Sequence, residues 1–316
     1  MNENNKVLVA VDGSKQAFNT ARYAARMLEG CGARIVLYHV RLNVDEAFYD
    51  IGINPAGRQQ MAAIRAWEHE QRKAADDLIE KACQIMEKAG IARERISVKA
   101  QHRKVGIARD LVKESHNGYD AVVVGRKGHH LIKGLVLGSV ANKVIEQLRH
   151  VTLWVVGGNP APEKLLVGLD ASEGAMRAVD HVVSTRNGHD RRQIYLMHVV
   201  RSVQTIPSLP SPLVSQIEQE RVDALVAEAT EAIHPVFEEA TSRLLKAGYK
   251  PDRIHTEVVS GVESRAMAMI QFARKNDIGT LIMGRRGLSR VEDFIMGRVG
   301  HKIVNTVRNR AVWIVV

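Results

Sequence analysis

Cysteine, aromatic residues and long apolar runs are all scarce in this chain of 316 residues. The two cysteines, Cys31 and Cys83, form no CxxC pair and have no histidine at metal-binding spacing, which argues against a disulfide framework and against a zinc site. Aromatic residues make up 4% of the chain, so we expect a mainly aliphatic core. No uninterrupted apolar run approaches the roughly 20 residues that a membrane-spanning helix needs.

The N-terminal sequence MNENNKVLVAVDGS lacks the features of a secretory leader. Polar residues lead into an apolar strand within six residues, which leaves no room for a basic region, an apolar stretch and a cleavage site. Together with the cysteine usage, this pattern predicts a cytoplasmic protein that is not attached to a membrane.

The formal net charge of +10 favours anionic partners without choosing among them. Lys and Arg number 24 against 17 Asp and Glu in residues 1–158, and 21 against 18 in residues 159–316. The sequence has no block of like charge and no basic stripe interleaved with aromatic residues. Nucleic-acid binding is therefore the least favoured of the functions considered below.

The chain contains the same unit twice. KVLVAVDGS at Lys6–Ser14 recurs as KLLVGLDAS at Lys164–Ser172, and KAGIARERI at Lys88–Ile96 recurs as KAGYKPDRI at Lys246–Ile254. Both pairs are offset by 158 residues, which is half of the chain length, so the protein is a tandem duplication. The Gly- and Pro-containing linker Gly157–Pro162 places the domains at residues 1–158 and 159–316.

Apolar runs of strand character alternate with segments of helical periodicity in each copy. The first copy predicts strands at Val7–Val11, Ile35–Val40, Ile96–Ala100, Ala121–Val124 and Val151–Val156, and helices at Lys15–Glu29, Met61–Ala89, Ile107–His116 and Ser139–Leu148. The second copy repeats this order, with one long helix predicted at Leu213–Ala247. The alternation predicts an α/β fold of two tandem doubly wound domains, each with a five-stranded parallel sheet.

The last strands of the two copies, Val151–Val156 and Ala311–Val316, are apolar along their whole length. An uncovered apolar strand at a sheet edge invites pairing with another strand. We therefore expect the two last strands to cover each other across an internal pseudo-twofold axis, which would make the chain an internal pseudo-dimer.

The loop GRKGHHLIKGLVLGS, residues 125–139, has glycines at positions 125, 128 and 138 and a serine at the start of a predicted helix. Spaced glycines before a helix suggest backbone N–H groups directed at an anion. The dinucleotide motif GxGxxG, the P-loop GxxxxGK[ST] and an SGGxD loop are all missing after the first strand. In a doubly wound sheet the loop would follow the fourth strand, beside the turn that carries Asp12, where ligands bind.

With Gly125, two residues, Gly128, nine residues and then Gly138–Ser139, the chain resembles a tandem universal stress protein of the ATP-binding branch. The resemblance covers both halves and implies a Rossmann-like fold of the adenine nucleotide alpha hydrolase-like kind. It implies a nucleotide site in the first half formed by Ala10, Asp12, Val40, Gly125, Arg126, Gly128, His129, Gly138, Ser139 and Val140.

The resemblance also implies a role for each part of this site. Asp12 would accept hydrogen bonds from ribose or adenine, and Val40 would meet the adenine edge. Gly125 and Gly128 would let the loop close over ribose and phosphates. The N-terminus of the helix that starts near Ser139 would present N–H groups to phosphate. Lys127 and Lys133 add positive charge nearby.

Ordinary structural roles compete with each of these assignments. Asp12 and Ser14 form a plausible turn and helix cap without any ligand. Val40 is a core-strand residue with or without adenine, and Ser139 is a candidate helix N-cap. Arg126 and Lys127 are of a type that is usually solvated.

The second half departs from the pattern at one position. Asp170, Val199, Gly284, Gly287 and Gly297 keep the spacing, but Arg298 stands where serine is expected. Arg298 could pair with phosphate, or it could fill the phosphate space and pair with Glu292 or Asp293. We therefore expect the second site to be weaker or empty.

The resemblance implies a stress-response regulatory protein that binds ATP, ADP or AMP, with Mg²⁺ held mainly by the phosphates. We identify no positioned base, nucleophile or metal-binding carboxylate pair, so we do not expect an enzyme. The alternative is a nucleotide-independent scaffold that acts through protein–protein contacts. The protein partner and any further dimerisation stay open.

Overall fold

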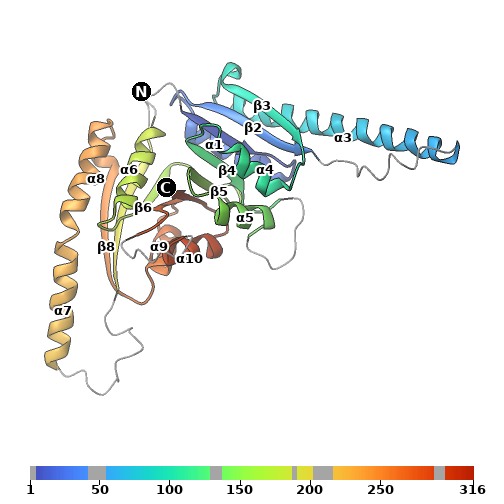
Figure 1. The fold of residues 1–316 in the computed structure, drawn as a ribbon. Helices are drawn as coiled ribbons and strands as arrows, with labels where there is room; N and C mark the ends of the chain where they lie inside the picture. The colour runs from blue at the N-terminus through green and yellow to red at the C-terminus, as the bar shows by residue number, and fades with distance from the viewer. Residues whose placement is uncertain (1–4, 42–54, 129–136, 187–190, 202–215, 288–295) are drawn as a thin grey trace. The chain divides into compact units, whose positions relative to one another are not determined.

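The computed structural model describes residues 5–41, 55–128, 137–186, 191–201, 216–287 and 296–316 (Figure 1). Its contacts divide the chain into two compact units, Met1–Leu148 and Arg149–Val316, and each unit is described by itself.

The sheet of the first unit contains four parallel strands in the order β3-β2-β1-β4. They are β1 (Lys6–Ala10), β2 (Arg34–Arg41), β3 (Ile96–His102) and β4 (Ala121–Gly125). The chain passes from β1 through β2 to β3 in one direction and then places β4 on the other side of β1. The strand order therefore reverses between β1 and β4, the position at which doubly wound sheets bind ligands.

Helices of the first unit pack in two pairs, which is the layering of a doubly wound fold. One pair is α1 (Lys15–Leu28) with α3 (Pro55–Lys88), and the other is α4 (Ile107–Glu114) with α5 (Ser139–Gln147). A short 3₁₀ turn, η2 (Arg93–Arg95), precedes β3. Most buried strand residues between the helix layers are aliphatic, including Leu8, Val9 and Val122, as the composition predicts.

The second unit contains six strands in the order β5-β10-β9-β6-β7-β8. They are β5 (Thr152–Val156), β6 (Lys164–Gly168), β7 (Gln193–Arg201), β8 (Ile254–Val262), β9 (Thr280–Gly284) and β10 (Ala311–Val315). Strands β6 to β10 form the expected five-stranded parallel sheet of the second repeat. Strand β5, which ends the first repeat, pairs antiparallel with β10, so the predicted pairing of the two last strands is confirmed.

Helices of the second unit repeat the two-layer arrangement, with α6 packed on α8 and α9 packed on α10. The helices are α6 (Glu173–Ser184), α7 (Gln216–Glu231), α8 (His234–Lys246), α9 (Arg265–Lys275) and α10 (Arg298–Thr306), and η5 (Pro251–Arg253) is a 3₁₀ turn before β8. Across the described ranges, no helix is long and apolar enough to span a membrane.

One feature differs from the sequence-based expectations. The single helix predicted at Leu213–Ala247 is wrong: α7 ends at Glu231 and α8 begins at His234, with Pro235 in its first turn. Proline has no N–H to donate, and its ring clashes with the carbonyl of the residue four positions earlier, so one helix cannot run through this point. The division of contacts after Leu148 places β5, the last strand of the first repeat, in the second unit, because β5 pairs with β10.

Candidate functional site

The reversal of strand order in the first unit brings two loops together. Asp12 follows β1, and the segment from Gly125 to Gly128 follows β4, its neighbour in the sheet. Val40 lies near the end of β2, on the other side of β1, and Ala10 is the last residue of β1. The structure therefore places the described members of the predicted site along one edge of the sheet.

Asp12 holds the turn that starts helix α1. Its Oδ1 accepts a hydrogen bond from the Ser14 backbone N at 3.0 Å, and the Ser14 hydroxyl accepts one from the Ala17 N at 3.1 Å. The turn and cap chemistry expected from the sequence is thus present. It uses one oxygen of the Asp12 carboxylate, whose side chain is exposed at the end of the strand.

The second oxygen of Asp12 lies against the glycine loop. A Cβ added to Gly128 would overlap Oδ2 of Asp12, so no residue other than glycine fits there without moving the carboxylate or the loop. This close approach supplies a physical reason for the second glycine of the motif. Gly125 has a different role, because it leaves room for two side chains of α1. A Cβ on Gly125 would lie 3.1 Å from the Gln16 Cγ and 3.2 Å from the Thr20 Oγ1.

The far end of the loop returns to its start. The Gly138 backbone N donates a hydrogen bond to the Arg126 carbonyl at 2.8 Å, and a Cβ on Gly138 would lie 3.4 Å from the Lys127 Cα. Helix α5 then begins, with Gly138 as its N-cap and Ser139 as its first helical residue. Ser139 is therefore not the N-cap, so the competing role considered for it does not apply.

Helix α5 begins directly after this closed loop, so its N-terminus lies beside the loop. Ser139 is exposed and Val140 is half-buried. The first N–H groups of a helix have no acceptor within the helix, and their dipoles attract an anion. The geometry can therefore present several N–H donors to an oxyanion at the position where β1 and β4 end.

Arg126 is buried, contrary to the sequence-based expectation. It was expected to be solvated, yet its side chain is buried at 3% exposure, and its contribution to the loop is the carbonyl that receives Gly138. Lys127 is half-buried beside it. His129 and Lys133 lie outside the described residues.

A histidine that the motif does not include also belongs to this site. The Nδ1 of His39, in β2, lies 2.8 Å from the Val11 carbonyl, directly before Asp12. Because a carbonyl can only accept, Nδ1 carries the proton and donates. Val11 also donates from its N to the Tyr38 carbonyl at 2.9 Å, so β2 holds the chain from both sides just ahead of Asp12. The repetition of HV in YHVR and MHVV was the available sequence signal.

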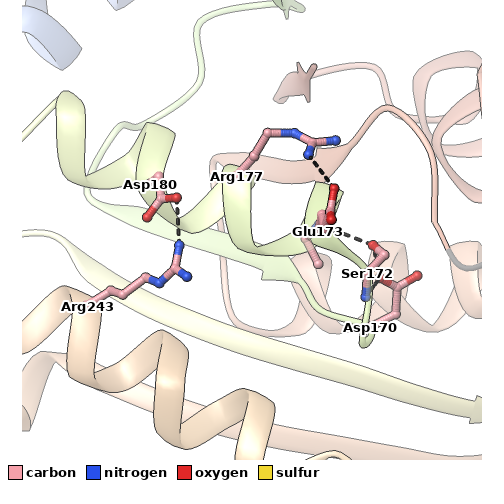
Figure 2. A network of polar contacts seen from close by, with 7 residues as sticks. Asp170, Ser172, Glu173, Arg177, Asp180 and Arg243 are labelled. Carbon is pink, nitrogen blue, oxygen red and sulfur yellow. Dashed lines mark hydrogen bonds and ion pairs between the residues drawn. The ribbon is translucent and has the colours of Figure 1, made fainter.

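The second repeat builds the same framework, of which Figure 2 shows Asp170 and Ser172. Asp170 Oδ1 accepts from both the backbone N and the hydroxyl of Ser172, and a Cβ on Gly287 would lie 2.5 Å from Asp170 Oδ2. The Gly297 N donates to the Arg285 carbonyl at 2.9 Å. His198 Nδ1 lies 2.8 Å from the Leu169 carbonyl, as His39 does from Val11.

The second framework is supported differently by its helices. Gly174 lies in the first turn of α6, and a Cβ on Gly284 would lie 2.9 Å from the Cα of Gly174. The backbone at the end of β9 therefore packs directly on the backbone of α6. Figure 2 shows the Glu173–Arg177 pair on α6 and the Asp180–Arg243 pair, which joins α6 to α8 at 2.7 Å. The hydrogen bonds that Arg243 donates to Asp180 and Glu239 raise the pKa of Arg243.

Charge in the second site departs from the first. Arg298 is the exposed first residue of α10, and Val199 is buried in β7. Burial, together with the nearby positive charges of Arg149 and Arg286, lowers the pKa of Arg285 to about 10. The acids Glu292 and Asp293 lie outside the described residues. Within the described part of the chain, no three His, Cys, Asp or Glu side chains gather to hold a metal ion.

Comparisons with known proteins agree with the duplicated fold. The model of the Universal stress protein family matches residues 3–156 and 162–315. A universal stress protein of Mycolicibacterium smegmatis is 28% identical over 228 residues, covering 70% of this chain and 72% of the relative. Universal stress protein YxiE of Bacillus subtilis is 22% identical over 141 residues, covering 44% of this chain and 90% of the relative.

A solved universal stress protein from Archaeoglobus fulgidus has a similar fold. It superposes with a TM-score of 0.62 at 18% identity, covering 98% of each chain. At that identity the likeness concerns the fold alone. The family model, in contrast, matches both repeats over nearly the whole sequence. This chain therefore belongs to the universal stress protein family.

Proposed function

We propose that the first repeat binds an adenine nucleotide, ATP, and that the protein is a stress-response regulator whose contacts with other proteins depend on nucleotide occupancy. The observation that carries the proposal is the closed glycine loop. Gly128 lies against Asp12, and Gly138 is bonded to Arg126, at the point where the strand order reverses. A surface turn would not need glycine at both contacts.

The residues at this site suit the ribose, the phosphates and the base of a nucleotide. The Asp12 carboxylate, which accepts a hydrogen bond from the Ser14 N, is an acceptor of the kind to which ribose hydroxyls donate. The N-terminus of α5 at Ser139 and Val140 offers N–H groups to phosphate. Val40 and Ala10, both half-buried at the strand ends, offer an apolar edge to the base. Mg²⁺ would be held mainly by the phosphates, and ATP acts here as a ligand rather than as a substrate.

The second repeat binds nucleotide more weakly in this proposal. It keeps the Gly287–Asp170 and Gly297–Arg285 contacts but begins α10 with Arg298 in place of Ser139. A hydroxyl next to the helix N-terminus is thereby lost. The two acids of its loop, Glu292 and Asp293, oppose an anion by charge.

The test is calorimetric titration of the nucleotide-free protein with ATP and Mg²⁺, beside the variant Gly138→Val. A valine would press on the Arg126 carbonyl, 3.2 Å from the added Cβ, and on Lys127, and so open the loop. The matched control is Gly106→Val. Gly106 is the N-cap of α4, also in extended conformation, and a Cβ there meets nothing within 4 Å.

One site per chain, abolished by Gly138→Val and kept by Gly106→Val, supports the proposal. Two equal sites would mean that Arg298 replaces the serine and that the second repeat is not degenerate. No binding by the unmodified protein would reject the proposal and favour the nucleotide-independent scaffold.

A further inference from the structure

Three arginines line a small polar pocket in the second unit, at the end of that unit's sheet opposite Gly284 and Gly287. The pocket has a volume of about 210 Å³ and is lined by Arg274 near the end of α9, Thr306 at the end of α10, and Arg308, Asn309 and Arg310 in the turn before β10, over Ile270 and Val307. It is far larger than the roughly 15 Å³ that one water needs. The contacts described above for the nucleotide loop involve none of these residues.

We propose that this pocket binds a phosphate group, either inorganic phosphate or a small phosphate monoester. The guanidinium group is planar, always charged and able to donate two parallel hydrogen bonds, which suits the oxygens of phosphate. Three such groups from separate positions match a tetrahedral anion with three free oxygens better than a two-oxygen carboxylate. Thr306 and Asn309 add neutral donors at the rim.

Arg310 is held in place by the fold. Its Nε donates to the Ile278 carbonyl at 2.7 Å and its Nη2 donates to the Ala273 carbonyl at 3.3 Å. These bonds engage Nε and Nη2 of the guanidinium, and the same residue lines the pocket. A donor that is already fixed loses little conformational entropy when an anion binds. The residue before β5, in contrast, is the buried Val151, so this arginine is a feature of the second repeat.

Arg274 and Arg308 are exposed, and neither side chain makes an ion pair with any residue that the structure describes. Burial lowers the pKa of Arg310, Asp277 opposes this effect, and the charge of Arg274 adds to it. The arginines therefore repel one another across the pocket. A bound dianion would remove this repulsion.

The negative ends of two helices also face this region, because α9 ends at Lys275 and α10 ends at Thr306. Each helix C-terminus acts as about half a negative charge, so the two together offset about one guanidinium. Asp277 offsets a second. A third positive charge is left over, so the pocket has a net attraction for an anion even after these opposing charges are counted.

The experiment titrates the full-length protein with inorganic phosphate and, separately, with glycerol 2-phosphate, by calorimetry at constant ionic strength. The variants are Arg274→Gln and Arg308→Gln, both exposed positions whose loss leaves the bonds of Arg310 intact. The matched control is Lys275→Gln, which removes the same charge from the next residue of α9 but does not line the pocket. Arg274→Lys keeps the charge and loses the paired donors.

We expect one saturable site, weakened at least about tenfold by each arginine-to-glutamine change and no more than about twofold by Lys275→Gln. The loss of phosphate affinity in Arg274→Lys should lie between that of the arginine-to-glutamine variants and that of Lys275→Gln. Tighter binding of the monoester identifies a phosphate ester as the ligand, and equal or tighter binding of the free ion identifies inorganic phosphate.

Three results would overturn the proposal: no saturable binding of either compound, equal weakening by Lys275→Gln and the arginine variants, or a loss in Gly138→Val instead. The last would assign the signal to the nucleotide loop. Failure of ATP binding in the earlier test leaves this pocket unaffected, because the two sites share no residue.

Discussion

Trp154 of β5 and Trp313 of β10 stand directly opposite each other in the sheet, and their rings stack with centroids 4.1 Å apart. Both side chains are fully buried. His181 of α6 meets both rings edge-on, at 5.8 and 5.4 Å between centroids, and its Nε2 accepts a hydrogen bond from the Trp154 Nε1 at 2.9 Å. The last strand of the first repeat is thereby anchored in the core of the second unit.

The two tryptophans should tolerate replacement unequally. Trp154→Phe removes the donor to His181 and leaves a histidine acceptor without its partner, whereas the Trp313 Nε1 is buried without a hydrogen bond to any described residue. Both changes lose similar apolar area. We expect Trp154→Phe to lower the free energy of unfolding by about 1–3 kcal/mol more than Trp313→Phe does. Urea unfolding of both variants measures the difference, and equal losses would contradict the role of the bond.

His181 should make stability depend on pH. Burial lowers the pKa of its imidazole from 6.5 to about 4. The unfolded chain therefore takes up this proton below about pH 6.5, while the folded protein takes it up only near pH 4. The contribution of His181 to the free energy of unfolding is fully present above pH 6.5 and is lost as the pH drops from 6.5 to 4. The loss approaches about 3 kcal/mol in total and is about 1.4 kcal/mol at pH 5.5.

The control for this pH effect is His181→Gln, which keeps an acceptor near the position of Nε2 but does not titrate. Urea unfolding at pH 7.5 and at pH 5.5 should show a smaller difference in the variant than in the unmodified protein, by about 1.4 kcal/mol. The other histidines contribute equally to both proteins and cancel. An unchanged pH dependence would mean that His181 titrates normally in the folded state.

The duplication and the order of the elements could be predicted from the sequence, because each rests on a local pattern. Short aliphatic runs such as Val7–Val11 can be buried from both sides, and Ser14 and Ser172 cap α1 and α6 as serines before helices commonly do. The break before α8 was missed, although Pro235 is the residue in the sequence that marks it. The stacking of Trp154 on Trp313 was not visible, because strand register depends on contacts between distant segments.

His39 is expected to position the turn that carries Asp12. Its Nδ1 donates to the Val11 carbonyl, so a variant that keeps a donor at that place should keep the turn. We expect His39→Asn, whose amide N lies near the position of Nδ1, to hold ATP affinity within about threefold. His39→Gln, whose amide lies near Nε2, should weaken binding about fivefold, because one neutral hydrogen bond contributes about 1 kcal/mol. Calorimetry on both variants makes the comparison, and equal affinities would reduce His39 to a packing residue.

The sequence predicts those parts of the candidate site that a glycine spacing defines. It does not predict the parts that depend on which side chains become buried. Gly128 and Gly138 were found by their intervals. The burial of Arg126 could not be found that way, because nothing in the local sequence separates a buried arginine from a solvated one. The role of His39 required the strand order, which places the end of β2 beside the end of β1.

Gly128→Ala should weaken ATP binding at least about tenfold, because the new methyl group would overlap Oδ2 of Asp12 and force the carboxylate or the loop away. Gly287→Ala creates the same conflict with Asp170 in the second repeat, where the added Cβ lies 2.5 Å from Oδ2. The two changes are matched in chemistry and in local strain, so their effects on folding should be similar. Calorimetric titration should then separate them, with ATP affinity lost in the first variant and kept in the second. If both variants lost affinity equally, the two repeats would contribute equally to nucleotide binding. If neither did, the contact between the glycine loop and Asp12 would have no part in holding the ligand.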